Sequence, residues 1–280
     1  AHLFPISYPR VLPFTELIGL SAERAAASWQ WSQSARTAAN AEISIGTGVS
    51  PHAPYSVHLP SIAAASTSLT PATPVAMHVA ESRDELQWLE TGQGAFAELF
   101  RRLGLQAEVA PPSIMECIAL LSRFRHSLLI HGNYLNSAEV ERIAAANMTV
   151  VYCPRTHRHF DHATYPLDSL RAAGVPIILG TDSRASNPSL SLWDEVAQAA
   201  SQHPQRDPSE WLRSVTLDAA CALGISNDFG SLQVGRWASA VALPVGADWS
   251  ADNLIDALCA SSAEELQMQP LGRLLWQRAC

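Results

Sequence analysis

Several features that would mark a specialised class of protein are missing from the sequence. Its five cysteines form no CxxC pair, so we expect reduced thiols in a cytoplasmic protein. No apolar run approaches the roughly 18–20 residues that a membrane-spanning helix needs. The first ten residues, AHLFPISYPR, lack the basic segment and following apolar segment of a secretory signal. We therefore expect neither a membrane protein nor a secreted one.

Charge of one sign is not concentrated anywhere in the chain. The net charge is −8, and there is no long run of acidic or basic residues. This argues against nucleic acid or an anionic membrane surface as a partner. At 280 residues, of which 48% are hydrophobic, the chain can form one large domain or two small ones.

What the sequence does contain is an alternation of short apolar runs with helical patterns. The runs are nearly continuous in Val, Ile, Leu and Ala, which is typical of strands buried on both faces of a parallel sheet. The predicted strands cover residues 10–18, 43–49, 75–79, 127–131, 148–153 and 175–180. Predicted helices cover residues 21–42, 167–173, 190–201 and 209–223. Two further helices begin at predicted capping boxes, Ser82 with Glu85 and Asn136 with Glu139.

The alternation of strands and helices predicts an α/β fold built from βαβ units. Six such strands are more than half of a TIM-type (β/α)8 barrel. We predict that this barrel occupies residues 1–225 and that residues 226–280 form an appendage. Within the appendage, the segment GSLQVGRWASAVALPVG is typical of a turn and one short strand.

Titratable residues follow one predicted strand after another. His78 and Glu81 end one strand, and His131 ends the next. His52 follows an earlier strand and Asp182 follows the last one. The ends of parallel strands in a barrel converge on one face, where active sites are built. Each residue alone could be a core histidine, a helix-start acid or an N-cap, but five such coincidences in order are improbable.

Three more histidines, His157, His159 and His162, lie in the segment CPRTHRHFDHATYP. Their spacing of two and three residues is loose for a metal site. We interpret them as part of a solvated loop or the rim of a pocket.

The residues at the strand ends suit hydrolysis assisted by a divalent metal. Imidazole and carboxylate groups such as His78 and Asp182 can hold a metal, which lowers the pKa of bound water to near neutrality. Glu81 could shuttle a proton to a leaving amine. His131 could orient the attacking water, and Asp182 could accept the first proton of that water.

The motifs SPHAPYSV, HVAE, IHGNYL, VVYCPRTH and LGTDSRASNPSLSLWDE, in this order, resemble the amidohydrolase superfamily, specifically its deaminase and chlorohydrolase branch. The resemblance extends over residues 10–243. It implies a (β/α)8 barrel with one divalent metal, Zn or Fe, and a small β-sandwich, of which a remnant would remain at the C-terminus. The resemblance implies that His78 and Asp182 are metal ligands, Glu81 is the proton shuttle, His131 is the catalytic histidine and His52 is a substrate-side histidine.

The sequence departs from the pattern of this family in three places. The HxH pair of the first barrel strand, which supplies two metal ligands in the family, is missing. Residues 10–18 resemble the third barrel strand, so the barrel is predicted to be N-terminally incomplete. The loop CPRTHRHF replaces Cys-Pro-x-Ser-Asn, and Ser239 stands where the tail motif has Asp. Two protein ligands fall short of the three expected at a catalytic zinc, and a barrel without two strands cannot close.

We favour a fragment of a longer enzyme over a remnant that has lost its metal, because Glu81 and Asp182 are both retained. The predicted reaction is hydrolytic deamination of a small purine- or nucleoside-like heterocycle. A triazine-type chlorohydrolase or cyclic amide hydrolase is the second hypothesis, and a metal-free, non-catalytic barrel remnant is the third. A homodimer could cover the open edge of the sheet. The predicted substrate-binding residues are His52, Asn133, Arg155 and Ser183.

Overall fold

The computed structural model describes residues 10–41, 43–105, 111–237, 239–242, 250, 253–266 and 269–270. They fall into two compact units. We call Pro9–Val151 together with Ala163–Pro176 the N-terminal unit. The C-terminal unit comprises Tyr152–His162 and the described residues from Ile177 onward.

The main sheet has six strands in the order β1-β2-β3-β4-β5-β6. Their bounds are β1 Phe14–Leu17, β2 Gly48–Pro51, β3 Val75–Val79, β4 Ser127–His131, β5 Thr149–Tyr152 and β6 Ile177–Leu179. Strands β1 to β5 pair in parallel. The two units divide within β5, whose last residue, Tyr152, accepts a hydrogen bond from the backbone N–H of Gly180, just after β6. Parallel neighbours in sequence order confirm the predicted α/β class, because each connection must cross over through a helix.

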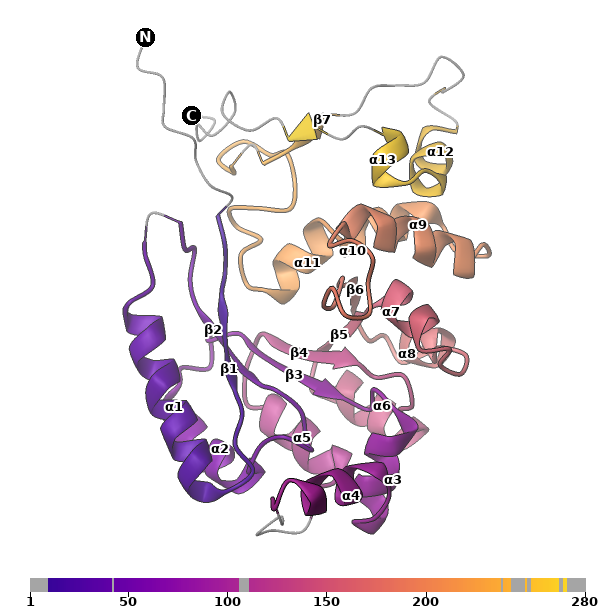
Figure 1. Ribbon diagram of the computed structural model, residues 1–280. Coiled ribbons are helices and arrows are strands. Elements are labelled where there is room, and N and C mark those ends of the chain that lie inside the picture. Colours follow the sequence, from indigo (N-terminus) through magenta and orange to yellow (C-terminus); the bar gives the residue numbers. More distant parts are fainter. Residues whose placement is uncertain are drawn as a thin grey trace. The chain divides into compact units, whose positions relative to one another are not determined.

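The helices of the N-terminal unit cover its strands (Figure 1). They are α1 Ala22–Thr37, α2 Leu59–Ala65, α3 Arg83–Thr91, α4 Ala95–Arg102, α5 Ile114–Leu121, α6 Ser137–Ala145 and α8 Leu167–Ala172, with a short 3-10 helix at Ser66–Ser68. Helix α1 packs on β1 and α2, and α5 packs on β3 and β4. The largest fully buried side chains of this unit include Leu17, Met77, Ile118, Leu121, Leu129 and Ile143. The core therefore lies between the sheet and its covering helices.

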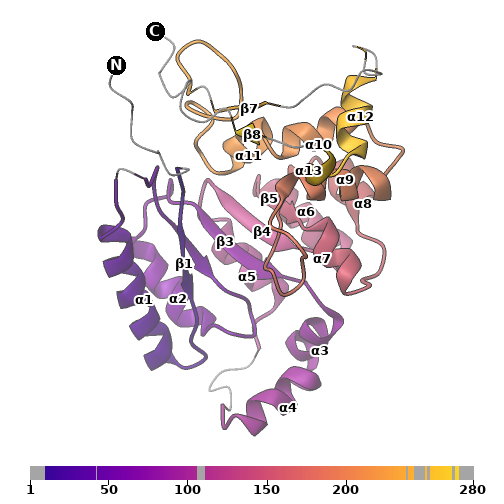
Figure 2. The same cartoon turned by 45° about the horizontal axis from the view of Figure 1, so that its top comes forward.

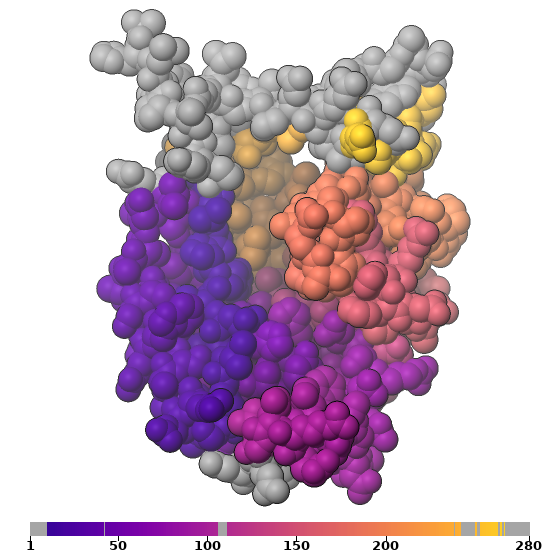
Figure 3. All heavy atoms as spheres, in the orientation of Figure 1, coloured from indigo at the N-terminus to yellow at the C-terminus, as the bar shows by residue number. Residues whose placement is uncertain are grey.

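Helices α3 and α4 follow directly on β3, and Figure 2 shows α4 continuing from α3 at the periphery of the N-terminal unit. The space-filling view places α4 at the surface (Figure 3, magenta), in agreement with the exposure of Leu99. The inner face of the same helix carries Phe100, which is buried and packs edge-on against Trp88 of α3. The pair thus has one face in contact with the unit and the other in water, as expected for an amphipathic element.

The C-terminal unit consists mainly of helices packed around β6. Its elements are α7 Pro154–His159, α9 Leu192–Gln202, α10 Pro208–Ser214, α11 Leu217–Ala222, α12 Leu254–Ala260 and α13 Ala263–Leu266. Strand β7 (Val241–Ala242) pairs antiparallel with β8 (Gln269–Pro270). The predicted short strand in the appendage is therefore present, although residues 238 and 243–246 of its segment lie outside the described residues. The boundary at residues 225 and 226, the sandwich remnant and the incompleteness of the barrel stay predictions.

Several predicted elements differ from the structure in their bounds. The strand predicted at residues 43–49 begins only at Gly48, because the ladder with the first strand is interrupted. Val11 pairs with Ser44 and Phe14 pairs with Gly48, so one side has an extra residue, as in a bulge. A Cβ at position 48 would lie 2.5 Å from the Phe14 ring, so only glycine fits where pairing resumes.

The helix predicted at residues 209–223 is two helices, α10 and α11, because Thr216 leaves the helical region with φ −126° and ψ −98°. The helix predicted at residues 21–42 ends earlier, at Thr37. Within the described residues, no helix is both long and apolar enough to cross a bilayer.

Candidate active site

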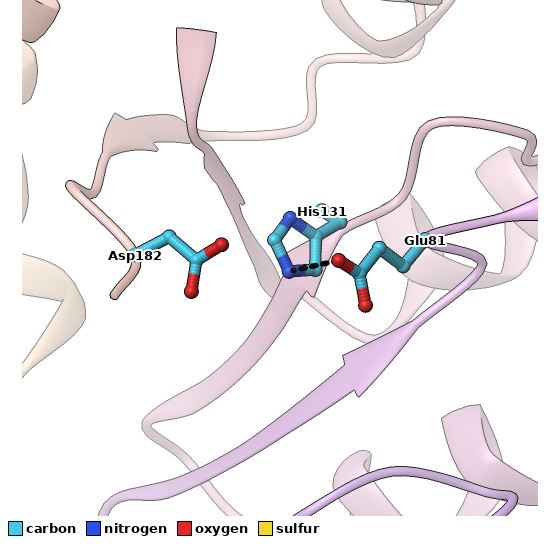
Figure 4. A group of neighbouring side chains, drawn as sticks. All are labelled: Glu81, His131 and Asp182. Atoms are coloured by element: carbon cyan, nitrogen blue, oxygen red, sulfur yellow. Dashed lines mark ion pairs between the residues drawn. The ribbon is translucent and has the colours of Figure 1, made fainter. Parts of the chain in front are cut away.

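The carboxyl ends of β3 and β4 lie side by side. Val79 is the pairing partner of His131, so the residues that follow β3 come next to the last residue of β4. His131 is 3% exposed, and its Nε2 lies 3.7 Å from Oε1 of Glu81, close enough for an ion pair when the imidazole is protonated. Figure 4 shows the Glu81 carboxylate pointing at this ring. The structure thus brings together two residues that the sequence separates by fifty positions.

His78 is held in one orientation by the neighbouring strand. Its Nδ1 lies 2.7 Å from the backbone oxygen of His52. A carbonyl only accepts hydrogen bonds, so Nδ1 carries the proton and Nε2 keeps a lone pair. This is the arrangement usual in a metal-binding histidine, whose second ring nitrogen donates to a carbonyl or carboxylate. The geometry of His78 therefore fits the predicted role of a metal ligand.

His52 completes a row of three imidazoles in the N-terminal unit. Its ring centre lies 5.1 Å from that of His78, which in turn lies 5.5 Å from that of His131. Nδ1 of His52 is 2.7 Å from the Ser56 hydroxyl oxygen. Burial, followed by the charge of His78, lowers the pKa of His52, and Glu16 opposes both effects. A neutral His52 at physiological pH can donate or accept a hydrogen bond from a bound molecule.

The backbone at these two strand ends adopts an unusual conformation. Ala80 has φ +56° and His131 has φ +71°, a region that residues with a side chain rarely occupy. Such residues cluster at functional sites and need support from their surroundings. Part of that support comes from Tyr165, whose hydroxyl donates to the backbone oxygen of His131 at 3.0 Å.

Asn133 was predicted to contact substrate, but its side chain is buried and has an internal partner. Its amide Nδ2 donates to the backbone oxygen of Glu81 at 2.9 Å. The residue thus holds the strand-end turn that carries Glu81.

Asp182 belongs to the C-terminal unit, where a chain of hydrogen bonds orients it; Figure 4 labels its side chain as well. The Ser186 hydroxyl donates to Oδ2 of Asp182 at 2.9 Å and lies 2.9 Å from the Thr156 hydroxyl. Asp182 has φ +56°, like the residues at the other strand ends. A carboxylate fixed through one oxygen can offer the other to a ligand, which fits the predicted metal role.

Arg155 and Ser183 differ in the hydrogen bonds that their side chains form within the C-terminal unit. The Arg155 guanidinium donates to Ser189 at 2.8 Å and to Asp194 at 3.2 Å. Ser183 is exposed, and its hydroxyl accepts from the backbone N–H of Ala185 at 3.2 Å. Both residues stay predicted substrate contacts, with Ser183 the more accessible of the two.

The interpretation of His157 as part of a solvated loop or pocket rim was wrong. The residue lies on α7, is 8% exposed and packs edge-on against Tyr152. The proline at the start of α7 suits a first helical turn, since it has no N–H to satisfy. The signal for this short helix was therefore Pro154.

Sequence reasoning missed two buried glutamates, Glu85 and Glu195, each 0% exposed. Glu195 accepts from the Arg155 backbone N–H at 3.0 Å and from the Asn187 amide at 2.5 Å. Asn187 in turn donates to the backbone oxygen of Thr181, next to Asp182, at 2.6 Å. Glutamate is rarely buried unless it is paired or hydrogen-bonded, but a sequence alone does not show which glutamates are buried.

Glu85 was predicted to be the second half of a capping box with Ser82. The Ser82 hydroxyl does accept from the Glu85 backbone N–H at 3.2 Å. The Glu85 carboxylate, however, accepts from the backbone N–H groups of Ala80 at 3.0 Å and Glu81 at 2.7 Å, which precede the cap. The corresponding prediction for Asn136 and Glu139 is confirmed, because both hydrogen bonds of that capping box are present.

Comparison with known proteins identifies the family of the chain. Residues 28–261 match the model of the amidohydrolase family. That is most of the sequence, and the chain belongs to this family.

Individual relatives and solved structures agree. The chain is 28% identical over 190 residues to an aminodeoxyfutalosine deaminase from Nitratiruptor, covering 66% of this chain and 45% of that protein. It is 28% identical over 187 residues to a 5-methylthioadenosine/S-adenosylhomocysteine deaminase from Pyrococcus furiosus, covering 64% and 41%. The structure of Helicobacter pylori aminofutalosine deaminase superimposes with a TM-score of 0.77 at 21% identity, covering 95% of this chain and 65% of that one. The chain thus shares the fold of these proteins and spans less than half the length of the two curated relatives.

Proposed function

We propose that the protein to which this chain belongs releases ammonia hydrolytically from an amino-substituted, nucleoside-like heterocycle. The observation that carries the proposal is the group formed by His52, His78, His131 and Glu81 at adjacent strand ends, with a carboxylate 3.7 Å from a buried imidazole. The relatives named above are deaminases of aminodeoxyfutalosine and of 5-methylthioadenosine/S-adenosylhomocysteine, which supports this substrate class.

A divalent metal, Zn or Fe, is part of the proposal. His78 would bind it through Nε2, and Asp182 through a carboxylate oxygen. When bound, such a metal lowers the pKa of a water molecule to near neutrality. These two residues fall short of the three protein ligands of a catalytic zinc site, so the proposal requires at least one further ligand.

The protein's own side chains would carry the protons. Asp182 accepts the first proton of the attacking water, and Glu81 carries the second to the leaving amine, because an amine departs readily only when protonated. His131, 3.7 Å away, donates a hydrogen bond that fixes the position of the water. His52, Arg155 and Ser183 contact the substrate, while Asn133 shapes the site through its internal hydrogen bond.

The proposal is tested by ammonia release from a panel of nucleosides, purines and triazines, with Zn or Fe supplied. Release from nucleosides is the expected result, and ring opening or chloride release without ammonia would refute deamination. Glu81→Gln should lower ammonia release by about 10²–10⁴-fold and leave the metal content unchanged. Glu90→Gln, at an exposed position on helix α3, which follows Glu81, is the control and should keep full activity.

A metal-free barrel remnant is the rival hypothesis. Elemental analysis of the purified chain tests this hypothesis. Negligible metal content, with no turnover after Zn or Fe is added, would support the remnant or a fragment of a longer enzyme for this chain. Tightly bound stoichiometric metal with turnover would refute it. An in-frame HxH upstream of Ala1 in the coding sequence would supply the two outstanding ligands.

A further inference from the structure

The Glu85 carboxylate holds both N–H groups of the turn between His78 and Glu81. Its two oxygens accept from Ala80 at 3.0 Å and from Glu81 at 2.7 Å. The side chain is 0% exposed. A carboxylate is costly to bury unless its lone pairs are used, and here the partners are backbone groups of the strand end that carries Glu81.

That turn needs such a support. Ala80 has φ +56°, a conformation that a residue with a Cβ adopts only under constraint. Successive backbone N–H groups in this conformation form a concave anion-binding arrangement, and the Glu85 carboxylate fills it. The carbonyl of Glu81 is held as well, by the Asn133 amide at 2.9 Å. Both polar groups of the Glu81 backbone are therefore fixed by buried side chains.

We propose that Glu85 is a positioning residue, which fixes the backbone of Glu81 and thereby holds the Glu81 carboxylate beside His131. The inference deepens the proposed function and rests on it only in that Glu81 is the proton carrier. Glu85 itself contacts the turn and takes no part in proton transfer.

The geometry demands a glutamate at this position. A glutamine has one acceptor oxygen and one NH₂ donor. After Glu85→Gln, the NH₂ group would face a backbone N–H, so one of the two hydrogen bonds would be lost. After Glu85→Asp, both oxygens remain, but the chain is one methylene shorter and the carboxylate withdraws from the turn. The two variants thus remove different parts of the same contact.

The matched control is Glu139→Gln. Glu139 is also buried, also sits in the first turn of its helix and also accepts a backbone N–H, that of Asn136 at 2.8 Å. It differs in that no hydrogen bond connects it with Ala80 or Glu81. If Glu85→Gln and Glu139→Gln lose the same stability, a change at the Ala80–Glu81 turn that occurs only in Glu85→Gln is due to the loss of the Glu85 carboxylate.

The first measurement is nuclear magnetic resonance of the whole chain at pH 8. Backbone amide protons hydrogen-bonded to a carboxylate resonate downfield. In Glu85→Gln, at least one of the Ala80 and Glu81 amide protons should move upfield and exchange with solvent about tenfold faster. Glu139→Gln should leave both signals unchanged. Unchanged signals in Glu85→Gln would overturn the proposal, and Glu85→Asp provides the same test if the glutamine variant does not fold.

The second measurement asks whether Glu85 acts on the contact between Glu81 and His131. In the wild-type chain, Glu81→Gln should shift the ring ¹⁵N signals of His131. In a Glu85→Gln background the same substitution should produce less than half of that shift, because the Glu81 side chain is no longer held in place. Equal shifts in the two backgrounds would refute the positioning role, since a double-mutant cycle measures the coupling directly.

Activity provides a separate outcome. In a catalytically active protein, Glu85→Gln should lower kcat about tenfold or more with little change in KM, since the substrate-side residues are untouched. An increase in KM with no change in kcat would contradict the proposal. If the wild-type chain releases no ammonia at all, the proposed function fails, but the two spectroscopic measurements still decide the role of Glu85.

Discussion

The stability of the protein should depend on pH through Glu85. Burial raises the pKa of this carboxyl from 4.5 to about 7, against the opposing effect of its backbone hydrogen bonds. Between these two pKa values the native state binds the proton and the unfolded state does not. The protonated group thus adds stability that is fully present below pH 4.5 and is lost as the pH rises through about 7.

The magnitude follows from the difference between the two pKa values. Each pH unit of difference corresponds to about 1.4 kcal/mol. Over the accessible range from pH 5 to pH 8, Glu85 should lower the free energy of unfolding by about 2.5 kcal/mol. The variant Glu85→Gln cannot titrate, so this component should be absent from its pH profile.

Urea unfolding, followed by tryptophan fluorescence at half-unit steps from pH 5 to pH 8, measures the effect. As the pH rises, the free energy of unfolding of the wild-type chain should fall relative to that of Glu85→Gln. Glu116→Gln is the control, because the backbone N–H of Ser113 lowers the pKa of Glu116 and its titration falls below this range. A constant difference between Glu85→Gln and the wild-type chain across the range would refute the reasoning.

Two further predictions concern the core and the thiols. Leu129→Ala, at a side chain that is 0% exposed, should lower the free energy of unfolding in urea by about 2–5 kcal/mol. Ile18→Ala, at a side chain that is 54% exposed, should lower it by about 0.5 kcal/mol or less. Equal losses in the two variants would contradict the described core. In a Cys280→Ser background, the exposed Cys221 should react fast with a thiol reagent, whereas Cys117, whose pKa burial raises, should react only on unfolding. A fast phase that persists after Cys221→Ser would show that a buried thiol is accessible.

The strand ends were predictable because of a simple physical constraint. Strands buried on both faces are apolar throughout, so a histidine or acid directly after the apolar run marks the point where the chain leaves the core. The runs ending at Val79 and His131 were predicted with their observed bounds. Parallel pairing then places His78, Glu81 and His131 at one edge of the sheet.

The strand predicted at residues 43–49 failed for an equally physical reason. Ile43 looks like a core residue by type, but its side chain is 37% exposed, and the ladder is interrupted after Ser44. Pairing resumes only at Gly48, where the Phe14 ring leaves no room for a side chain. The register of the two strands decides which residue packs against a neighbouring ring. Register depends on both strands together, so the sequence of one strand does not reveal it.

The sequence by itself determined the α/β class, the family and the residues that carry the proposed chemistry, because each of these depends on residue type and on spacing along one strand or helix. Only the tertiary structure decided how those residues are supported. The carboxylate of Glu85 accepts hydrogen bonds from the turn before its helix, and the amide of Asn133 holds the Glu81 backbone. Whether a polar side chain faces a ligand or its own backbone depends on which donors and acceptors lie nearby in space, and that is known only when the chain is folded.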